Sequence, residues 1–148
     1  MTYNGIAHDS LYSAPVKRME GYLEDTIDSA ADVFTSWPTK SMQNKSQTYP
    51  FVVVKPPLIS TESMTFKGSS KQANLSYQIY CYSNNAKSID VIGDEVLSTL
   101  SDSTGINWFW DSTALQFENI ESSDQRKLTI GKKKVYEKLI TARYKWRG

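Results

Sequence analysis

The sequence predicts an α+β domain in which two main helices pack on a mostly antiparallel sheet. Two segments with helical periodicity, several segments of alternating apolar and polar residues, and the order helix, strands, helix, strands lead to this prediction. A chain of 148 residues, 39% of them hydrophobic, can bury the core of one domain. Because no Pro- or Gly-rich linker divides it, we expect a single domain over 1–148 with a flexible N-terminal segment over 1–14.

The first helix is expected to begin near Pro15, a residue that suits the first turn because its missing N–H is not needed there. Apolar residues then recur at steps of three and four along one helical face: Val16, Met19, Leu23, Ile27, Ala30, Ala31 and Phe34. The segment 36–38, Ser-Trp-Pro, is predicted to end this helix, since the residue before a proline resists helical geometry.

Strands are predicted on both sides of a second helix. Residues 49–54 form a short strand that two prolines terminate, and residues 58–68 form a second strand or an arm. Residues 75–82 alternate between apolar and polar side chains, which is the period of a strand. After an N-cap at Asn84-Asn85 comes a helix of about four turns, whose apolar residues are Ile89, Ile92, Val96, Leu97 and Leu100.

The last third of the chain is predicted to complete the sheet. The segment 108–110, Trp-Phe-Trp, is expected in or beside a short strand, and residues 115–120 in the next strand. A polar loop over 121–134 follows. The final strand begins near Val135, and its two faces are Val135, Leu139 and Thr141 against Tyr136, Ile140, Ala142, Tyr144 and Trp146.

The residues that usually carry chemistry are few. One histidine and one cysteine cannot make a typical zinc site, and Cys81 lies on the apolar face of a strand, which predicts a buried structural thiol. Residues 8–10, His-Asp-Ser, are adjacent and cannot adopt triad geometry. Asp90, Asp94 and Glu95 fall on the polar side of a helix, where a solvated face accounts for them. We therefore expect no enzymatic activity, no cofactor and no metal.

Two further patterns concern the cellular compartment. No stretch approaches the roughly 20 apolar residues that a membrane span needs, so no membrane partner is expected. The first residues lack the pattern of a signal peptide, which together with the lone cysteine favours synthesis in the cytoplasm.

Charge is distributed unevenly along the chain. The sequence holds 17 basic and 16 acidic residues, yet nine of the basic ones lie between Arg126 and Arg147. The predicted first helix holds an acidic row, Glu20, Glu24, Asp28 and Asp32. Three interpretations stay open: two solvated faces, a contact between the acidic helix and the basic strand within or between subunits, and nucleic-acid binding. Against the last stand a pI of 7.7 and the lack of an RNP, helix-turn-helix or zinc-finger pattern.

The order of elements resembles the tail terminator proteins of long-tailed bacteriophages and related viruses. The resemblance spans roughly residues 16–146 and rests on YPFVVV, LSYQIYCYS, NAKSIDVIGDEVLSTL and KVYEKLITARYKW, with the pair Asp124 and Arg126 in the loop before the last strand. It implies a tail-terminator-like α/β sandwich that assembles into a ring, usually a hexamer. Such a ring sits on the last tail-tube ring at the head–tail junction of the virion, stops tube growth and presents the head-joining surface.

The resemblance also implies partners and surfaces. A ring needs one patch of each subunit to meet a different patch of the next, so we expect a subunit interface of Glu20, Glu24 and Asp28 against Lys138, Arg143 and Lys145. We expect a flexible partner-binding loop with Asp124, Arg126, Lys127, Lys132, Lys133 and Lys134. The tail tube protein and a head–tail connector or neck protein are the implied partners, and DNA passes through the ring without specific binding.

Two alternatives stay open. One is another ring-forming head–tail connector or tail completion protein. The other is a small nucleic-acid-binding module that uses Tyr80, Tyr82 and the basic C-terminal segment.

Overall fold

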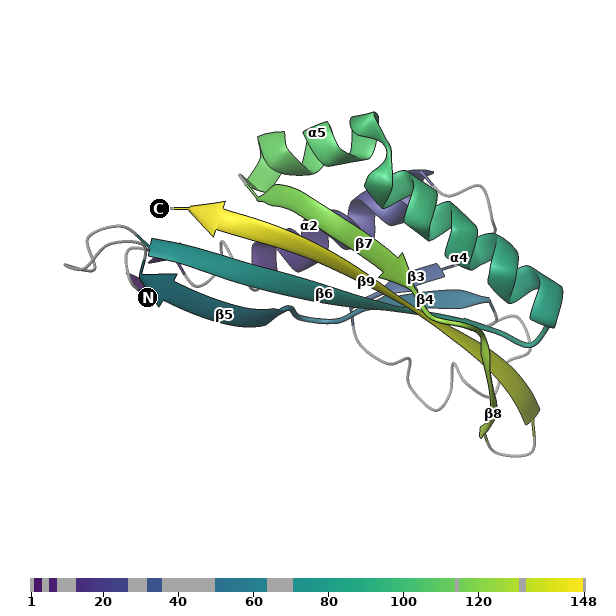
Figure 1. The fold of residues 1–148 in the computed structure, drawn as a ribbon. Helices are drawn as coiled ribbons and strands as arrows, with labels where there is room; N and C mark the ends of the chain where they lie inside the picture. Colours follow the sequence, from purple (N-terminus) through teal and green to yellow (C-terminus); the bar gives the residue numbers. More distant parts are fainter. Residues whose placement is uncertain are drawn as a thin grey trace.

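In the computed structural model, the described residues form three helices that cover one face of a mostly antiparallel sheet (Figure 1), which confirms the predicted α+β class. The structure describes residues 2–3, 6–7, 13–26, 32–35, 50–63, 71–113, 115–130 and 133–147. Near the N-terminus, strands β1 (Thr2–Tyr3) and β2 (Ile6–Ala7) pair with each other, apart from the main sheet.

Helix α2 (Ser13–Thr26) is shorter than predicted. Its first turn contains Pro15, and Val16, Met19 and Leu23 bury its apolar face as expected. The prediction that this helix extends to residue 36 is wrong, because 32–34 form strand β3 (Asp32–Phe34), parallel to β4 (Phe51–Val54). Val and Phe fit a sheet well, and the edge of β4 offers this segment the hydrogen bonds that an extended helix would have supplied internally.

The main sheet has the strand order β3-β4-β6-β9-β7, with β5 beside β6 and β8 beside β9. Apart from β3 and β4, its strands are β5 (Leu58–Ser63), β6 (Lys71–Ser83), β7 (Gln116–Ser122), β8 (Arg126–Ile130) and β9 (Lys133–Arg147). Of the segment 58–68, expected as a second strand or an arm, residues 58–63 form β5 and residues 64–68 lie outside the described residues. Every pairing in this sheet is antiparallel except that of β3 with β4.

The long strands β6 and β9 form the centre of the sheet. Their register runs from Gln72 opposite Arg147 to Ser83 opposite Tyr136. The alternation predicted for both strands is confirmed: odd-numbered residues of β6 from 73 to 81 and the β9 residues Ile140, Ala142 and Tyr144 are buried under the helices.

A second apolar cluster lies on the opposite face of the sheet at one end. Its buried members are Phe51, Val53, Tyr82 and Val135, and Phe34, Tyr80 and Leu128 pack against them. The main core takes Val52 and Val54 from the same strand β4. Strand β4 is therefore buried on both faces, which explains why its four residues show no alternation.

Helices α4 (Ala86–Ser101) and α5 (Ser103–Thr113) complete the helical layer. The predicted cap is confirmed, since Asn85 Oδ1 accepts hydrogen bonds from the N–H groups of Lys87 and Ser88. The expectation of a strand around 108–110 is wrong, because these residues belong to α5. Asp102 directly precedes that helix, and its carboxylate accepts a hydrogen bond from the N–H of Gly105 at 2.7 Å.

The aromatic residues of α5 explain the difference from the prediction. Phe109 is buried against Tyr77 and Tyr144, with ring centroids 6.1 and 4.7 Å away. Trp108 stacks on Tyr22 of α2 at 4.4 Å, whereas Trp110 is 51% exposed. Aromatic residues favour strands in isolation, and here their packing on the core favours the helix instead.

Gly105 is a point of close approach between α4 and α5. A Cβ at this position would collide with the carbonyl oxygen of Thr99. We predict that Gly105→Ala lowers the free energy of unfolding by about 1–3 kcal/mol through overpacking, measured by urea unfolding.

Gly21 of α2 is the matched control, because nothing lies within 4 Å of a Cβ placed there. Gly21→Ala should raise the free energy of unfolding by about 0.5–1 kcal/mol, as expected for Gly to Ala in a helix. Equal effects of the two substitutions would contradict the predicted clash.

Candidate interaction surfaces

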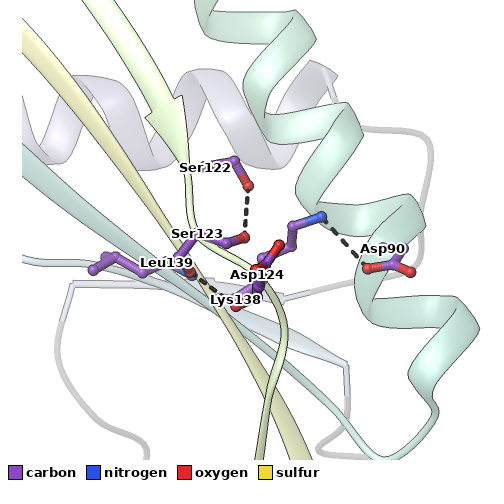
Figure 2. Close-up of polar contacts among 6 residues, drawn as sticks. All are labelled: Asp90, Ser122, Ser123, Asp124, Lys138 and Leu139. Carbon is purple, nitrogen blue, oxygen red and sulfur yellow. Dashed lines mark hydrogen bonds and ion pairs between the residues drawn. The ribbon is translucent and has the colours of Figure 1, made fainter.

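Lys138, one of the three strand cations expected at a subunit interface, has a partner within its own chain. It lies on the helix side of β9, and its Nζ is 3.4 Å from Asp90 Oδ1 on α4 (Figure 2). Its stem crosses α4 at Gly93, where a Cβ would be 2.7 Å from Lys138 Cδ. Only 15% of the Lys138 side chain is exposed. This lysine therefore ties the helical layer to the sheet.

The other two strand cations lie on the opposite face and pair with β7. Arg143 Nη2 is 2.7 Å from Glu121 Oε1, and its Nη1 donates to Asn119 Oδ1 at 3.0 Å. Lys145 Nζ is 3.3 Å from Glu118 Oε1. Exposed ion pairs of this kind stabilise by at most about 1 kcal/mol each. The basic strand thus contacts acids of its own chain, from β7 and α4.

Of these acidic partners, Glu118 and Glu121 were not singled out in the sequence, and Asp90 was interpreted only as part of a solvated helix face. A cross-strand signal exists for Arg143, since Asn119 is its direct neighbour in the register of β7 and β9. This pair follows only from the register of the two strands, and a β-bulge between Phe117 and Asn119 shifts that register by one position.

The predicted partner-binding loop is mostly a β-hairpin. Strand β8 pairs with β9 from Arg126 opposite Glu137 to Ile130 opposite Lys133, so a loop over 121–134 is wrong. The connection from β7 is held against β9 by Ser123, which donates its N–H to the Leu139 carbonyl at 2.8 Å and accepts the Leu139 N–H on its Oγ at 3.0 Å (Figure 2). Regular pairing with β9 explains why a polar segment is extended here.

The expected loop residues have different environments. Asp124 is exposed in the connection, and Arg126 Nε lies 3.9 Å from Glu137 Oε1 while 71% of the arginine side chain is exposed. Lys127 on β8 and Lys134 on β9 are exposed. Lys133 is the first residue of β9, and Lys132 lies outside the described residues.

Helix α2 ends at Thr26, so only Glu20 and Glu24 of the predicted acidic row lie on it. Glu24 is exposed and Glu20 half-buried on this helix. Asp28 lies outside the described residues, and Asp32 is an exposed residue of β3. Asp25, also exposed, follows Glu24 on the helix. The acidic surface of α2 in the described chain therefore consists of Glu20, Glu24 and Asp25.

Cys81 is buried in the main core, as predicted. Burial raises the pKa of its thiol to about 12, and the charge of Lys138 offsets only part of this effect. A thiol in this state is a poor nucleophile at neutral pH. Among the described residues, no group of three or more His, Cys, Asp and Glu side chains could hold a metal ion.

The aromatic residues invoked for nucleic-acid stacking are largely occupied. Tyr82 is 5% exposed and stacks on Phe51 at 5.1 Å. Tyr80 stacks on Tyr82 at 6.3 Å, and Lys55 Nζ lies 4.6 Å from the centre of its ring. A base would have to displace these neighbours.

Among the described helices, none is both long enough and apolar enough to cross a bilayer.

Comparison with known proteins gives a structural match without a match in sequence. No family model matches the chain, and no curated protein matches it in sequence. Its fold is similar to that of a chain in the solved virion of a native gene transfer agent particle, with a TM-score of 0.52 and 11% identity. The match covers 91% of this chain and 93% of that one. The fold described above is therefore shared with a component of a virion particle.

The buried Cys81 thiol makes folding sensitive to alkali. Because its folded pKa of about 12 exceeds the ordinary value of 9.0, the folded state holds the proton more tightly than the unfolded chain does. This stability is present below pH 9 and is lost as the pH rises toward 12. Burial also raises the pKa of Tyr77, Tyr82 and Tyr144 above the ordinary value of 10.0. We predict that the free energy of unfolding falls by up to about 1.4 kcal/mol per pH unit for each group, above about pH 9 for the thiol and above about pH 10 for the tyrosines.

Urea unfolding at several pH values measures this slope, and Cys81→Ala provides the comparison. The variant should keep the tyrosine contribution and lose that of the thiol, so its stability should decline less steeply above pH 9. Identical slopes for the two proteins would show that the thiol does not contribute.

Proposed function

We propose that this chain is a structural protein of a virion tail that forms a ring on the tail tube, ends tube elongation and provides the head-joining surface. The observation that supports the virion role most directly is the fold shared with a gene transfer agent virion chain over nearly the full length of both. The tail terminator role is the finer part of the proposal and is supported by the sequence resemblance over residues 16–146.

The distribution of charge is compatible with assembly from identical subunits. Acidic residues gather on α2, and basic residues gather on β8 and β9. Two different patches on one subunit suit a heterologous contact, and such contacts close into rings when the rotation between subunits permits it.

A hexamer is the ring size that the resemblance favours. The tail tube protein and a head–tail connector are the proposed partners, with DNA crossing the ring unbound.

The subunit interface expected from Glu20, Glu24 and Asp28 against Lys138, Arg143 and Lys145 stays a prediction. Each of the three cations already has an acid of its own chain beside it. Arg143 and Lys145 are partly exposed and could exchange these partners at low cost, whereas Lys138 is mostly covered by α4.

The second candidate is another ring-forming head–tail connector or completion protein, for which the shared virion fold is equally favourable. The two functions differ in what the ring binds. A terminator binds the open end of a tail tube, and a connector binds a portal. The nucleic-acid-binding module is disfavoured because Tyr82 is buried.

We predict that the purified protein forms rings, alone or on the ends of tail tubes. Electron microscopy should show rings and their symmetry. Added to polymerising tail-tube protein below its molar amount, the chain should shorten the tubes and appear at one end of each. Protein that stays monomeric at high concentration and leaves tube length unchanged would contradict the proposal.

We also propose that the chain has no enzymatic activity, because no acid, base or nucleophile set was found in the sequence. Assays with nucleotide, peptide and glycan substrates should give no turnover above background. A turnover that disappears on substitution of one residue would contradict this part of the proposal.

A further inference from the structure

The paired strands β8 and β9 project beyond the end of the sheet as a two-stranded ribbon (Figure 1). Strand β6 ends at Ser83, opposite Tyr136 of β9. The pairs from Leu128 opposite Val135 to Ile130 opposite Lys133 therefore lie past the last residue of β6. This ribbon end is built from regular pairing and is placed where another molecule can reach it.

Two lysines of the ribbon lie on the same face. Lys127 is opposite Tyr136, and residues 134, 136 and 138 share one side of β9 by the period of the strand. That side is the one from which Lys138 contacts α4. Both Lys127 and Lys134 are exposed, and neither forms an ion pair within the part of the chain that the structure describes.

The beginning of α4 adds positive potential at the same end of the sheet. Helix α4 begins at Ala86, directly after the end of β6 that pairs with Tyr136. Its first turn holds no acid and includes the exposed Lys87. The N-terminus of a helix bears a partial positive charge that nearby acids would normally offset. We call Lys87, Lys127 and Lys134 the basic end.

The second half of α2 has the opposite character. Glu20, Glu24 and Asp25 lie there, and the last turn holds no basic residue to offset the partial negative charge of the helix C-terminus. The two bases of this helix, Lys17 and Arg18, are in its first half. No ion pair to these three acids occurs among the described residues. We call Glu20, Glu24 and Asp25 the acidic end.

We propose that the basic end of one copy of the chain docks on the acidic end of α2 in the next copy. The inference rests on the proposed ring, and it names the surfaces that join its subunits. The cations at the centre of β9 are bound to acids of their own chain, while Lys127 and Lys134 are left for a partner. Because the two surfaces differ and lie on separate elements, the contact is head-to-tail and can repeat around a ring.

Two charge-reversal variants test the contact. One is Lys127→Glu with Lys134→Glu, and the other is Glu20→Lys with Glu24→Lys. Each alone sets like charges against each other and should assemble about tenfold or more weakly than the original at low salt. An equimolar mixture should assemble again, because each reversed surface meets its reversed counterpart and the two unaltered surfaces also match.

Light scattering and native mass spectrometry measure the assembly, and thermal unfolding shows that each variant is folded. The rings of the mixture should contain the two variants in equal number. Asp94→Lys is the control for a changed surface charge, since this acid is exposed on α4 and not on α2, and it should assemble like the original.

The possible failures are distinguishable. If the original neither forms rings nor binds tube ends, the proposed function fails and the contact with it. If the original assembles and either reversed variant alone does so equally well, the contact is wrong and the ring stands. The same conclusion follows if the mixture stays unassembled. Salt-sensitive binding of an oligonucleotide that Lys127→Glu with Lys134→Glu abolishes, without an effect on assembly, would assign the basic end to phosphate and overturn the contact.

Discussion

The antiparallel pairing of β6 with β9 is the constraint on which the other elements depend. It sets Leu75 beside Tyr144, Tyr77 beside Ala142 and Ile79 beside Ile140 on the face that the helices cover. A slip of one residue would turn Arg143 and Lys145 toward the core and Tyr144 toward solvent, so the register is strongly specified. Every other strand of the main sheet except β3 then pairs with one of these two.

The same register divides the basic C-terminal segment into two groups with different roles. On the face of β9 away from the helices, Arg143 and Lys145 form ion pairs with acids of β7. On the face that the helices cover, Lys138 pairs with Asp90. From the last residue of β6 onward, β9 pairs with β8 and not with β7, and Lys127 and Lys134 stay exposed. Some of the cations that are concentrated near the C-terminus therefore form ion pairs within the chain, and others lie exposed on the surface.

Sequence reasoning succeeded where one face of a long element is buried and the other is not. The alternation of β6 and β9 and the period of α4 follow directly from that asymmetry.

Prediction from the sequence failed where tertiary contacts decided between two locally acceptable structures. Phe34 continues a helical period but belongs to a strand that pairs with β4, and Trp108 and Phe109 favour a strand but belong to helix α5. The polar partners Asp90 and Glu121 are remote in sequence, so no local pattern could join them to Lys138 and Arg143.

Placing β9 beside β6 also determines how the chain must fold. The residues of β9 lie about 50–75 positions after their partners in β6. During synthesis, β6 therefore emerges with one edge of unpaired backbone groups beside its apolar side chains, and it must wait for the later strand. A waiting edge of this kind pairs readily with other copies. Strands β4 and β5, which are made earlier and pair with the other edge of β6, would halve that exposure in the nascent chain.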